Sequence, residues 1–200
     1  MTVFGLTGGI ACGKSSVAEI FRNSGVPMVD ADKVARSLVY PGSPVLQKTV
    51  KHFGQDILLE DGNLNRRKLA KLVFGDQKKM DLLNNINRKP IRAAINTALK
   101  ETELTARLIG YDCALIIEMG QRKKYRPLVV VATSDEIQLH RLMARNLLTA
   151  AEAKKRIQMQ MSTTDKLQYA DYVIWNNGEE AELLSRTMEV VYRLLINVPS

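Results

Sequence analysis

The chain contains 200 residues, with 29 Lys or Arg against 21 Asp or Glu, a formal net charge of +8 and 46% hydrophobic residues. This ordinary apolar fraction and modest charge exclude a globally disordered chain. At about 150 residues a domain, the length predicts a single domain over residues 1–200. No apolar run approaches the roughly 20 residues that cross a bilayer, so we expect no membrane partner.

The N-terminus and the cysteines indicate a compartment. The first residues, Met1-Thr-Val-Phe-Gly-Leu-Thr7, lack the basic and apolar regions of a secretory signal. The two cysteines, Cys12 and Cys113, are too few to stabilise a fold of this size through disulfide bonds, and they form no C-x-x-C pair. We therefore expect free thiols and a cytoplasmic protein.

The positive charge is concentrated in one part of the chain. Residues 65–100 contain ten Lys or Arg and two acids, and the other 164 residues contain 19 of each sign, so this basic block carries the whole excess of +8. Such a block indicates either a polyanionic partner or a set of solvated helix faces, and composition alone does not separate the two.

The first elements in chain order predict a parallel strand–helix–strand unit. Residues 3–6 form a short apolar run before a pair of glycines, which is typical of a buried strand that enters a glycine loop. Helical spacing then predicts a helix over residues 14–24. A second short strand is expected over residues 26–29, ending at Asp30.

The middle of the chain predicts helices. From residue 43 to about residue 107, apolar residues recur at steps of three and four. Asn65 is placed as an N-cap and Pro90 at the start of a helix. This region is therefore expected to be a helical insertion.

Strand patterns return in the last part of the chain. Two solid apolar runs, residues 113–117 and 128–132, predict strands that are buried on both faces of a parallel sheet. The remaining elements are expected to be a helix over 134–148 that begins at Ser134, a helix that a Thr149–Glu152 capping box opens, a strand over 172–175 and a helix over 179–196. The apolar face of the last helix comprises Leu183, Leu184, Met188, Val191, Leu194 and Leu195. The fold class is therefore α/β, with a five-stranded parallel sheet and a helical excursion between its second and third strands.

Residues 8–15 match the phosphate-loop pattern G-x-x-x-x-G-K-[ST]. The glycines let backbone N–H groups turn inward around phosphate oxygens, and the following helix directs its positive end at the same anion. Lys14 is expected to reach the β- and γ-phosphates of ATP, and Ser15 to ligate Mg²⁺. The expected strand before the loop and helix after it are the context that this motif requires.

Other features favour a small-molecule kinase among P-loop proteins. The N-K-x-D and D-x-x-G motifs of GTPases do not occur in the sequence. Glu118 after the run 113–117 is weak support for a motor ATPase. Arg141 and Arg145 lie one helical turn apart, where guanidinium groups could cover a transferring phosphate or simply face solvent.

An acidic pair follows the second predicted strand. Asp30 and Asp32 lie at its carboxyl end, where open parallel sheets place ligand-binding residues. A kinase that acts on a hydroxyl benefits from a carboxylate that accepts the hydroxyl proton. The alternative is that one of these acids caps a helix over residues 33–39.

Together these segments resemble the dephospho-CoA kinase family, P-loop kinases with a nucleoside monophosphate kinase-like core, over most of the chain. The resemblance rests on Gly5-Leu-Thr-Gly-Gly-Ile with Gly13-Lys-Ser15; Gly25-Val-Pro-Met-Val-Asp-Ala-Asp32 with Ala35-Arg36; Gly62-Asn-Leu-Asn-Arg66; Gln138, Arg141, Arg145 and Gln160; and Ala170-Asp-Tyr-Val-Ile174 with Asn176 and Gly178.

The resemblance implies transfer of the ATP γ-phosphoryl group to the ribose 3′-hydroxyl of dephospho-CoA with Mg²⁺, the last step of coenzyme A biosynthesis. It implies a core of residues 1–40, 108–133 and 170–200, an acceptor-binding insertion over about 41–107, and a helical lid over about 134–169. The implied catalytic residues are Asp32 as base, Lys14 and Arg141. The ATP site would comprise Gly9, Ile10, Ala11, Cys12, Gly13, Lys14, Ser15, Ser16, Arg141, Arg145, Asn176 and Gly178. The acceptor site would comprise Asp32, Arg36, Asn65, Arg66 and Glu118.

The sequence departs from the family pattern at three places. Lys89-Pro90 stands where the family usually shows His-Pro, Ala114-Leu-Ile-Ile-Glu118 replaces Pro-Leu-Leu-x-Glu, and Ala11-Cys12 replaces smaller loop residues. The alternatives to this enzyme are another P-loop nucleotide or metabolite kinase, and a nucleotide-responsive protein that binds nucleic acid through the basic block. Because the block contains a single aromatic residue, Phe74, we expect no nucleic-acid partner. We expect a monomer or small homo-oligomer.

Overall fold

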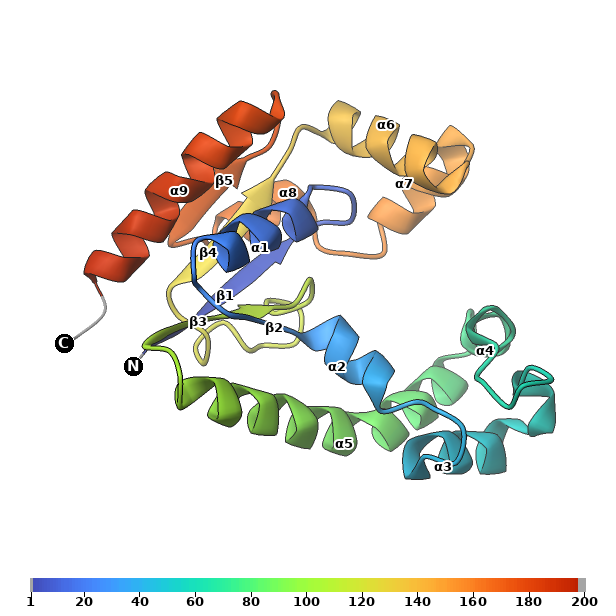
Figure 1. Cartoon of the computed structure of the whole chain (residues 1–200). Helices are drawn as coiled ribbons and strands as arrows, with labels where there is room; N and C mark the ends of the chain where they lie inside the picture. Colours follow the sequence, from blue (N-terminus) through green and yellow to red (C-terminus); the bar gives the residue numbers. More distant parts are fainter. Residues whose placement is uncertain (1, 198–200) are drawn as a thin grey trace. The chain divides into compact units, whose positions relative to one another are not determined.

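Two compact units make up the chain (Figure 1). The computed structural model describes residues 2–197. The core unit comprises Met1–Asp30 and Glu101–Ser200, and the helical unit comprises Ala31–Lys100. The functional division into core, insertion and lid that the sequence predicts stays a prediction.

The core unit contains a five-stranded sheet in the order β2-β3-β1-β4-β5, with every neighbouring pair parallel. The strands are β1 (Thr2–Gly8), β2 (Met28–Asp30), β3 (Leu108–Asp112), β4 (Leu128–Ala132) and β5 (Tyr172–Trp175). In the register of the sheet, Leu6 pairs with Asp112 on one side and with Val129 on the other. The five carboxyl ends therefore share one edge, and the predicted parallel sheet is confirmed.

The prediction of a strand over residues 113–117 is wrong. The third strand is Leu108–Asp112, and the apolar run after it forms a turn in which Cys113, Ile116 and Ile117 are still buried. Residues 108–112 are the ones that pair with β1 and β2, and this strand contains a glycine, Gly110, that the apolar pattern did not suggest. A Cβ there would lie 2.1 Å from the Met28 sulfur, so the space beside Gly110 is filled by the Met28 side chain of β2.

Five helices belong to the described part of the core unit: α1 (Lys14–Asn23), α6 (Asp135–Asn146), α7 (Ala150–Ile157), α8 (Thr163–Leu167) and α9 (Glu180–Ile196). The hydroxyl of Ser134 accepts a hydrogen bond from the backbone N–H of Ile137, as its predicted N-cap role requires. The capping box of Thr149 and Glu152 is also present. These local predictions are confirmed.

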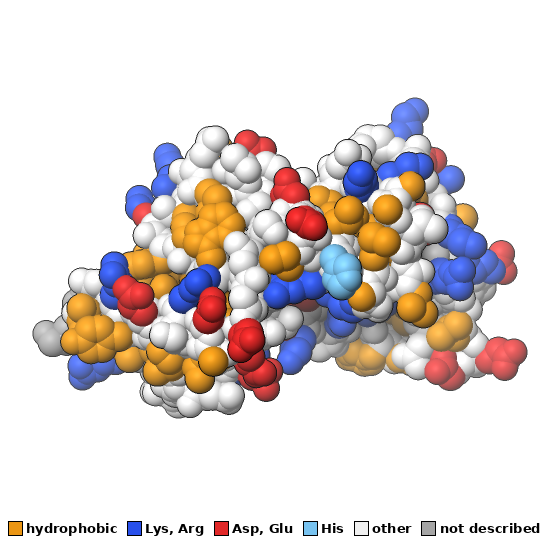
Figure 2. Space-filling view, turned by 90° about the horizontal axis from the view of Figure 1, so that it is seen from above, with side chains coloured by type: hydrophobic (Ala, Val, Ile, Leu, Met, Phe, Trp, Pro, Cys, Tyr) orange, Lys and Arg blue, Asp and Glu red, His pale blue; other side chains and the backbone are white. Residues whose placement is uncertain are grey.

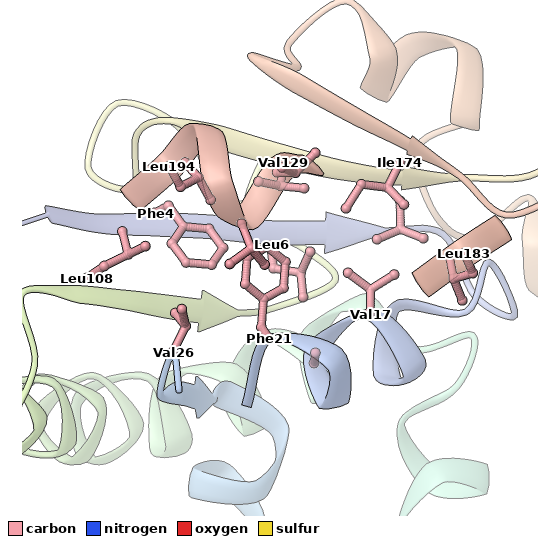
Figure 3. Close-up of a cluster of buried hydrophobic side chains, with 14 of the residues drawn as sticks. Phe4, Leu6, Val17, Phe21, Val26, Leu108, Val129, Ile174, Leu183 and Leu194 are labelled. Carbon is pink, nitrogen blue, oxygen red and sulfur yellow. The ribbon is translucent and has the colours of Figure 1, made fainter. Parts of the chain in front are cut away.

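The main hydrophobic core lies between the sheet and the pair α1 and α9 (Figure 3). Phe4 and Leu6 point to the same face of β1 because side chains alternate along a strand. The ring of Phe4 contacts that of Phe21 from α1, with centroids 4.9 Å apart. Leu183 and Leu194 complete the core from α9.

The buried face of α9 differs in part from the predicted one. Leu183, Val191 and Leu194 are buried as expected, but Leu184, Met188 and Leu195 are exposed. The polar residue Thr187 is buried instead. Its hydroxyl donates a 2.7 Å hydrogen bond to the carbonyl of Leu183, which removes the cost of burying that hydroxyl.

The helical unit has a smaller core of its own. It contains α2 (Ala31–Ser37), α3 (Pro44–Phe53), the short 3₁₀ turn η1 (Gln55–Ile57), α4 (Arg66–Val73) and most of α5 (Gln77–Glu103). Ile57, Leu69 and Val73 are buried at its centre. Asn65 caps α4 as predicted, because its side-chain oxygen accepts from the N–H of Lys68.

The prediction that Pro90 begins a helix is wrong. Pro90 lies inside α5, a helix of 27 residues. A proline inside a helix removes one backbone hydrogen bond. Apolar residues of α5 are packed on both sides of Pro90, since Leu83 contacts the small core of the helical unit and Ile95 is buried. In the described part of the chain, residues 2–197, no helix combines the length and apolar character that spanning a membrane would require.

The burial pattern of α9 predicts a contrast between two neighbouring leucines. Leu194 is 2% exposed and Leu195 is 48% exposed. Leu194→Ala should lower the free energy of unfolding by about 2–5 kcal/mol because it leaves a cavity in the main core. Leu195→Ala should lower it by less than about 1 kcal/mol. Urea denaturation measures both, and equal losses would contradict the observed face of α9.

Candidate functional site

A phosphate loop joins β1 to α1. It occupies residues 8–13, at the carboxyl end of the central strand, and α1 begins at Lys14. Ala11 and Gly13 adopt left-handed backbone conformations, with φ of 61° and 88°. A Cβ at Gly13 would lie 2.0 Å from the Asn176 amide nitrogen, so only glycine fits there. The strand, loop and helix that the motif requires are confirmed.

The loop presents a series of backbone donors. Within residues 2–197, the backbone N–H groups of Ala11, Gly13, Lys14 and Ser15 donate no hydrogen bond to other protein groups. Alternating left-handed residues gather such groups into a concave anion-binding nest, and the positive end of α1 adds to the attraction. The geometry therefore suits a phosphate chain.

An ion pair lies beside the loop. The Lys14 ammonium group donates to the carboxylate of Asp112, which ends β3 and is 3% exposed. Burial raises the pKa of Asp112, Lys14 opposes this rise, and the nearby charge of Asp30 adds to it. The sequence interpretation missed Asp112 because it placed the strand over residues 113–117 and sought the acid at Glu118. The signal was available, since Asp112 follows directly after Leu108–Tyr111.

Glu118 lies in a different arrangement within the core unit. Its carboxylate accepts hydrogen bonds from the Lys166 ammonium group at 2.6 Å and from the backbone N–H of Met161 at 3.2 Å. Lys166 is fully buried and also donates to the carbonyl of Ala114 at 3.0 Å. Glu118 thus balances a buried charge, and the acceptor-binding role expected for it stays a prediction.

The two arginines of α6 have different surroundings. The Arg141 guanidinium group donates to the backbone carbonyl of Asn176 at 3.0 Å and is partly buried. Arg145 is exposed, and its Nε donates to the side chain of Asn146 at 3.1 Å. The structure therefore fixes Arg141 beside the loop-contacting residue Asn176, whereas Arg145 faces solvent.

Three side-chain amides contact the loop backbone. Gln138 donates to the carbonyl of Ile10 at 2.8 Å, and Gln160 accepts from the N–H of the same residue at 2.8 Å. Asn176, expected in the ATP site, donates to the carbonyl of Cys12 at 3.0 Å. The sequence interpretation gave no loop contact to either glutamine, because an amphipathic pattern does not show what a polar residue touches.

Cys12 is a buried spacer within the loop. Its thiol is fully buried, and burial raises its pKa above the ordinary value. A raised pKa favours the neutral thiol over the nucleophilic thiolate, and the buried side chain has no access to solvent.

The helical unit contains a separate pocket of about 250 Å³. Three charged residues of the predicted acceptor site line it, namely Asp32, Arg36 and Arg66. Its walls are mainly apolar, with Val39, Val45, Leu64, Leu69, Leu83 and Ile91. The oxygen of Asn65, also expected there, is occupied by its capping bond to Lys68.

The basic side chains of the block are exposed. All ten of its Lys and Arg residues face solvent, and Arg66 is the member that lines the pocket. On the face shown in Figure 2, basic side chains lie among acidic and hydrophobic ones. Most of the block therefore forms ordinary solvated helix faces.

The oxygen donors beside the loop suit one type of metal ion. Within residues 2–197, no group of three or more His, Cys, Asp or Glu side chains could hold an ion by itself. Ser15 in the first turn of α1 and the carboxylate of Asp112 offer two oxygen ligands near Lys14. Mg²⁺ in kinases is held by one or two carboxylates together with substrate phosphates, so the residues present fit this ion.

A phosphate loop at the centre of a five-stranded parallel sheet defines a P-loop kinase fold. The shikimate kinase from Acinetobacter baumannii shares this fold, with a TM-score of 0.53 at 16% sequence identity, over 100% of this chain and 96% of that one. A dephospho-CoA kinase from Campylobacter jejuni superposes with a TM-score of 0.72 at 27% identity, over 96% of both chains. A protein of known structure from Thermus thermophilus reaches 0.83 at 29% identity, also over 96% of both chains.

Sequence comparison identifies the family within this class. The family model described as dephospho-CoA kinase matches residues 2–182. The dephospho-CoA kinase of Syntrophotalea carbinolica is 40% identical over 98% of this chain and 93% of its own length. That of Arabidopsis thaliana is 40% identical over 97% of this chain and 84% of its own. The chain belongs to the dephospho-CoA kinase family, whose members are enzymes that use ATP.

The buried pair of Glu118 and Lys166 yields a stability prediction. Glu118→Ala should lower the free energy of unfolding by about 3–5 kcal/mol because it leaves the buried ammonium group without its counter-charge. The exposed pair of Glu189 and Arg193 provides a matched control, and Glu189→Ala should cost less than about 1 kcal/mol. Urea denaturation compares the two. The double variant Glu118→Ala/Lys166→Met should recover most of the loss, and no recovery would contradict the assignment.

Proposed function

We propose that the chain transfers the γ-phosphoryl group of ATP to the ribose 3′-hydroxyl of dephospho-CoA, which gives coenzyme A and ADP in the last step of coenzyme A biosynthesis. Membership of the dephospho-CoA kinase family over residues 2–182 supports the reaction. The observation that carries the proposal is the phosphate loop, with its unpaired N–H groups beside the Lys14–Asp112 pair. The cytoplasm is the proposed compartment, and a monomer or small oligomer the proposed state.

The core unit provides the groups for the phosphates of ATP. The N–H groups of the loop would bind phosphate oxygens, and Lys14 would neutralise charge on the transferring group. Arg141, held at the carbonyl of Asn176, is placed to stabilise the charge that spreads over the γ-phosphate. Arg145 and Gly178 keep their proposed places in the ATP site, Arg145 as an exposed side chain of α6.

Ser15 and Asp112 are the residues that would hold Mg²⁺ together with the ATP phosphates. When bound, the ion supplies positive charge that polarises the phosphoryl oxygens. Asp112 would have a second task, which is to hold the Lys14 ammonium group at the end of β3. Its partial desolvation strengthens that interaction relative to one in bulk water.

The helical unit provides the groups for the acceptor. Asp32 would accept the proton of the 3′-hydroxyl as the oxygen attacks the γ-phosphorus. Arg36 and Arg66 line the same pocket, and their planar guanidinium groups match the oxygens of the pyrophosphate in dephospho-CoA. The apolar walls suit the uncharged part of the acceptor.

The base assignment predicts the behaviour of Asp32→Asn. The variant should bind ATP normally but lose about 10²–10⁴-fold in kcat, because an amide cannot accept the hydroxyl proton. ADP release with dephospho-CoA as acceptor measures turnover, with AMP, adenosine and simple sugars as comparison acceptors. An unchanged kcat would remove the base assignment. Turnover of AMP but not of dephospho-CoA by the unsubstituted protein would favour another nucleotide kinase.

The pocket predicts different roles for two neighbouring arginines of α4. Arg66 lines the pocket, and Arg67, which is also exposed, is not among its lining residues. Arg66→Ala should raise the KM for dephospho-CoA about tenfold or more, because a charge-assisted contact to the acceptor is lost. The KM for ATP should stay unchanged. Arg67→Ala removes the same charge from the same helix, so an equal effect in both variants would mean that net charge alone attracts the acceptor.

A further inference from the structure

The direction of two peptide groups in the phosphate loop is fixed from outside the loop. The carbonyl of Ile10 accepts from the side-chain amide of Gln138 at 2.8 Å, and the carbonyl of Cys12 accepts from that of Asn176 at 3.0 Å. Both donors are more than nine-tenths buried, with exposures of 3% for Gln138 and 7% for Asn176. Neither donor belongs to the loop motif itself.

A hydrogen bond that fixes the direction of a peptide carbonyl also fixes the direction of the N–H group in the same peptide, which belongs to the next residue. The peptide bonds after Ile10 and Cys12 are trans, and in a trans peptide the C=O and N–H bonds point in opposite directions. The N–H groups that follow are those of Ala11 and Gly13, which have no protein partner in the described part of the chain. Both residues also have positive φ, the conformation that a rotated peptide plane would disturb.

We propose that Gln138 and Asn176 are positioning residues, which turn the N–H groups of Ala11 and Gly13 toward the bound phosphates by holding the preceding carbonyls away from them. This inference rests on the proposed ATP-dependent function. It gives Asn176 a role through its side-chain donor to the loop rather than through contact with the adenine base. It also explains why two buried amides from α6 and from the end of β5 converge on one loop.

The chemistry of these contacts requires a donor. An amide group can donate to a carbonyl, whereas a carboxylate of the same shape only accepts and would repel it. Gln160 and Asn177 have the opposite requirement, because each uses its oxygen as an acceptor. Gln160 accepts from the N–H of Ile10. Asn177 accepts two hydrogen bonds of 2.9 Å, one from the hydroxyl of Thr133 and one from the N–H of Ser134.

This difference defines a test with matched controls. Gln138→Glu and Asn176→Asp add a negative charge and abolish the donor. Gln160→Glu and Asn177→Asp add the same charge near the same segments and keep an acceptor. Binding of ADP, measured by calorimetry, should weaken at least about tenfold more in the first pair of variants than in the second. Because salt screens buried charges only weakly, neutral variants rather than added salt separate donor loss from charge.

Two neutral variants separate donor loss from charge and from folding. Gln138→Met and Asn176→Leu keep side-chain bulk without a donor, and should also weaken ADP binding while leaving the affinity for adenosine unchanged. In turnover assays, the KM for ATP should rise with an unchanged KM for the acceptor and an unchanged preference for ATP over GTP. Melting curves check that each variant is folded at the assay temperature.

Two results would overturn the proposal. Equal ADP affinities across both pairs of acidic variants would assign the effect to charge alone, and a selective loss of ATP over GTP in Asn176→Leu would place that residue at the base. Because ADP binding requires neither acceptor nor turnover, these outcomes are independent of whether dephospho-CoA is the substrate.

Discussion

The ion pair between Lys14 and Asp112 ties the phosphate loop to the centre of the sheet. Its partners come from the helix that follows β1 and from the end of β3, two strands that are neighbours in the parallel register. Removing a carboxylate from water is costly, and the lysine offsets that cost only if the loop brings it to the end of the strand. The position of the loop, and thus of its N–H groups, depends on this pairing.

The phosphate loop and the pocket of about 250 Å³ belong to different units, and each unit has a core of its own. In the core unit, the phosphate loop lies between the sheet and α1, and the side-chain amides of Gln138 and Asn176 donate hydrogen bonds to it. The helical unit builds its pocket on the small core around Ile57, Leu69 and Val73. Because the pocket rests on a separate core, substitutions in its walls need not repack the core that supports the phosphate loop.

Sequence reasoning succeeded where the signal is local. The loop motif, the strand over 172–175 and the caps at Ser134 and Thr149 all depend on residues within a few positions of one another. Sequence reasoning failed where contacts between residues far apart in the sequence determine the local structure. Gly110 lies in a strand that pairs with two neighbours, and Met28 from the neighbouring strand β2 fills the space beside it, whereas Pro90 lies inside a helix of 27 residues. The contacts of Gln138 with the loop, 128 positions away, leave no periodic pattern, so the donors that orient the loop could be found only in three dimensions.

The buried thiol of Cys12 has a consequence for the behaviour of the loop under oxidative stress. Peroxides attack the thiolate form of cysteine, and attack requires access from solvent. Cys12 is fully buried and its pKa is raised, so it lacks both properties although it lies within a loop built to attract anions. Burial thus disfavours oxidation of the one sulfur atom in the loop, and we expect the loop to keep its conformation under oxidising conditions.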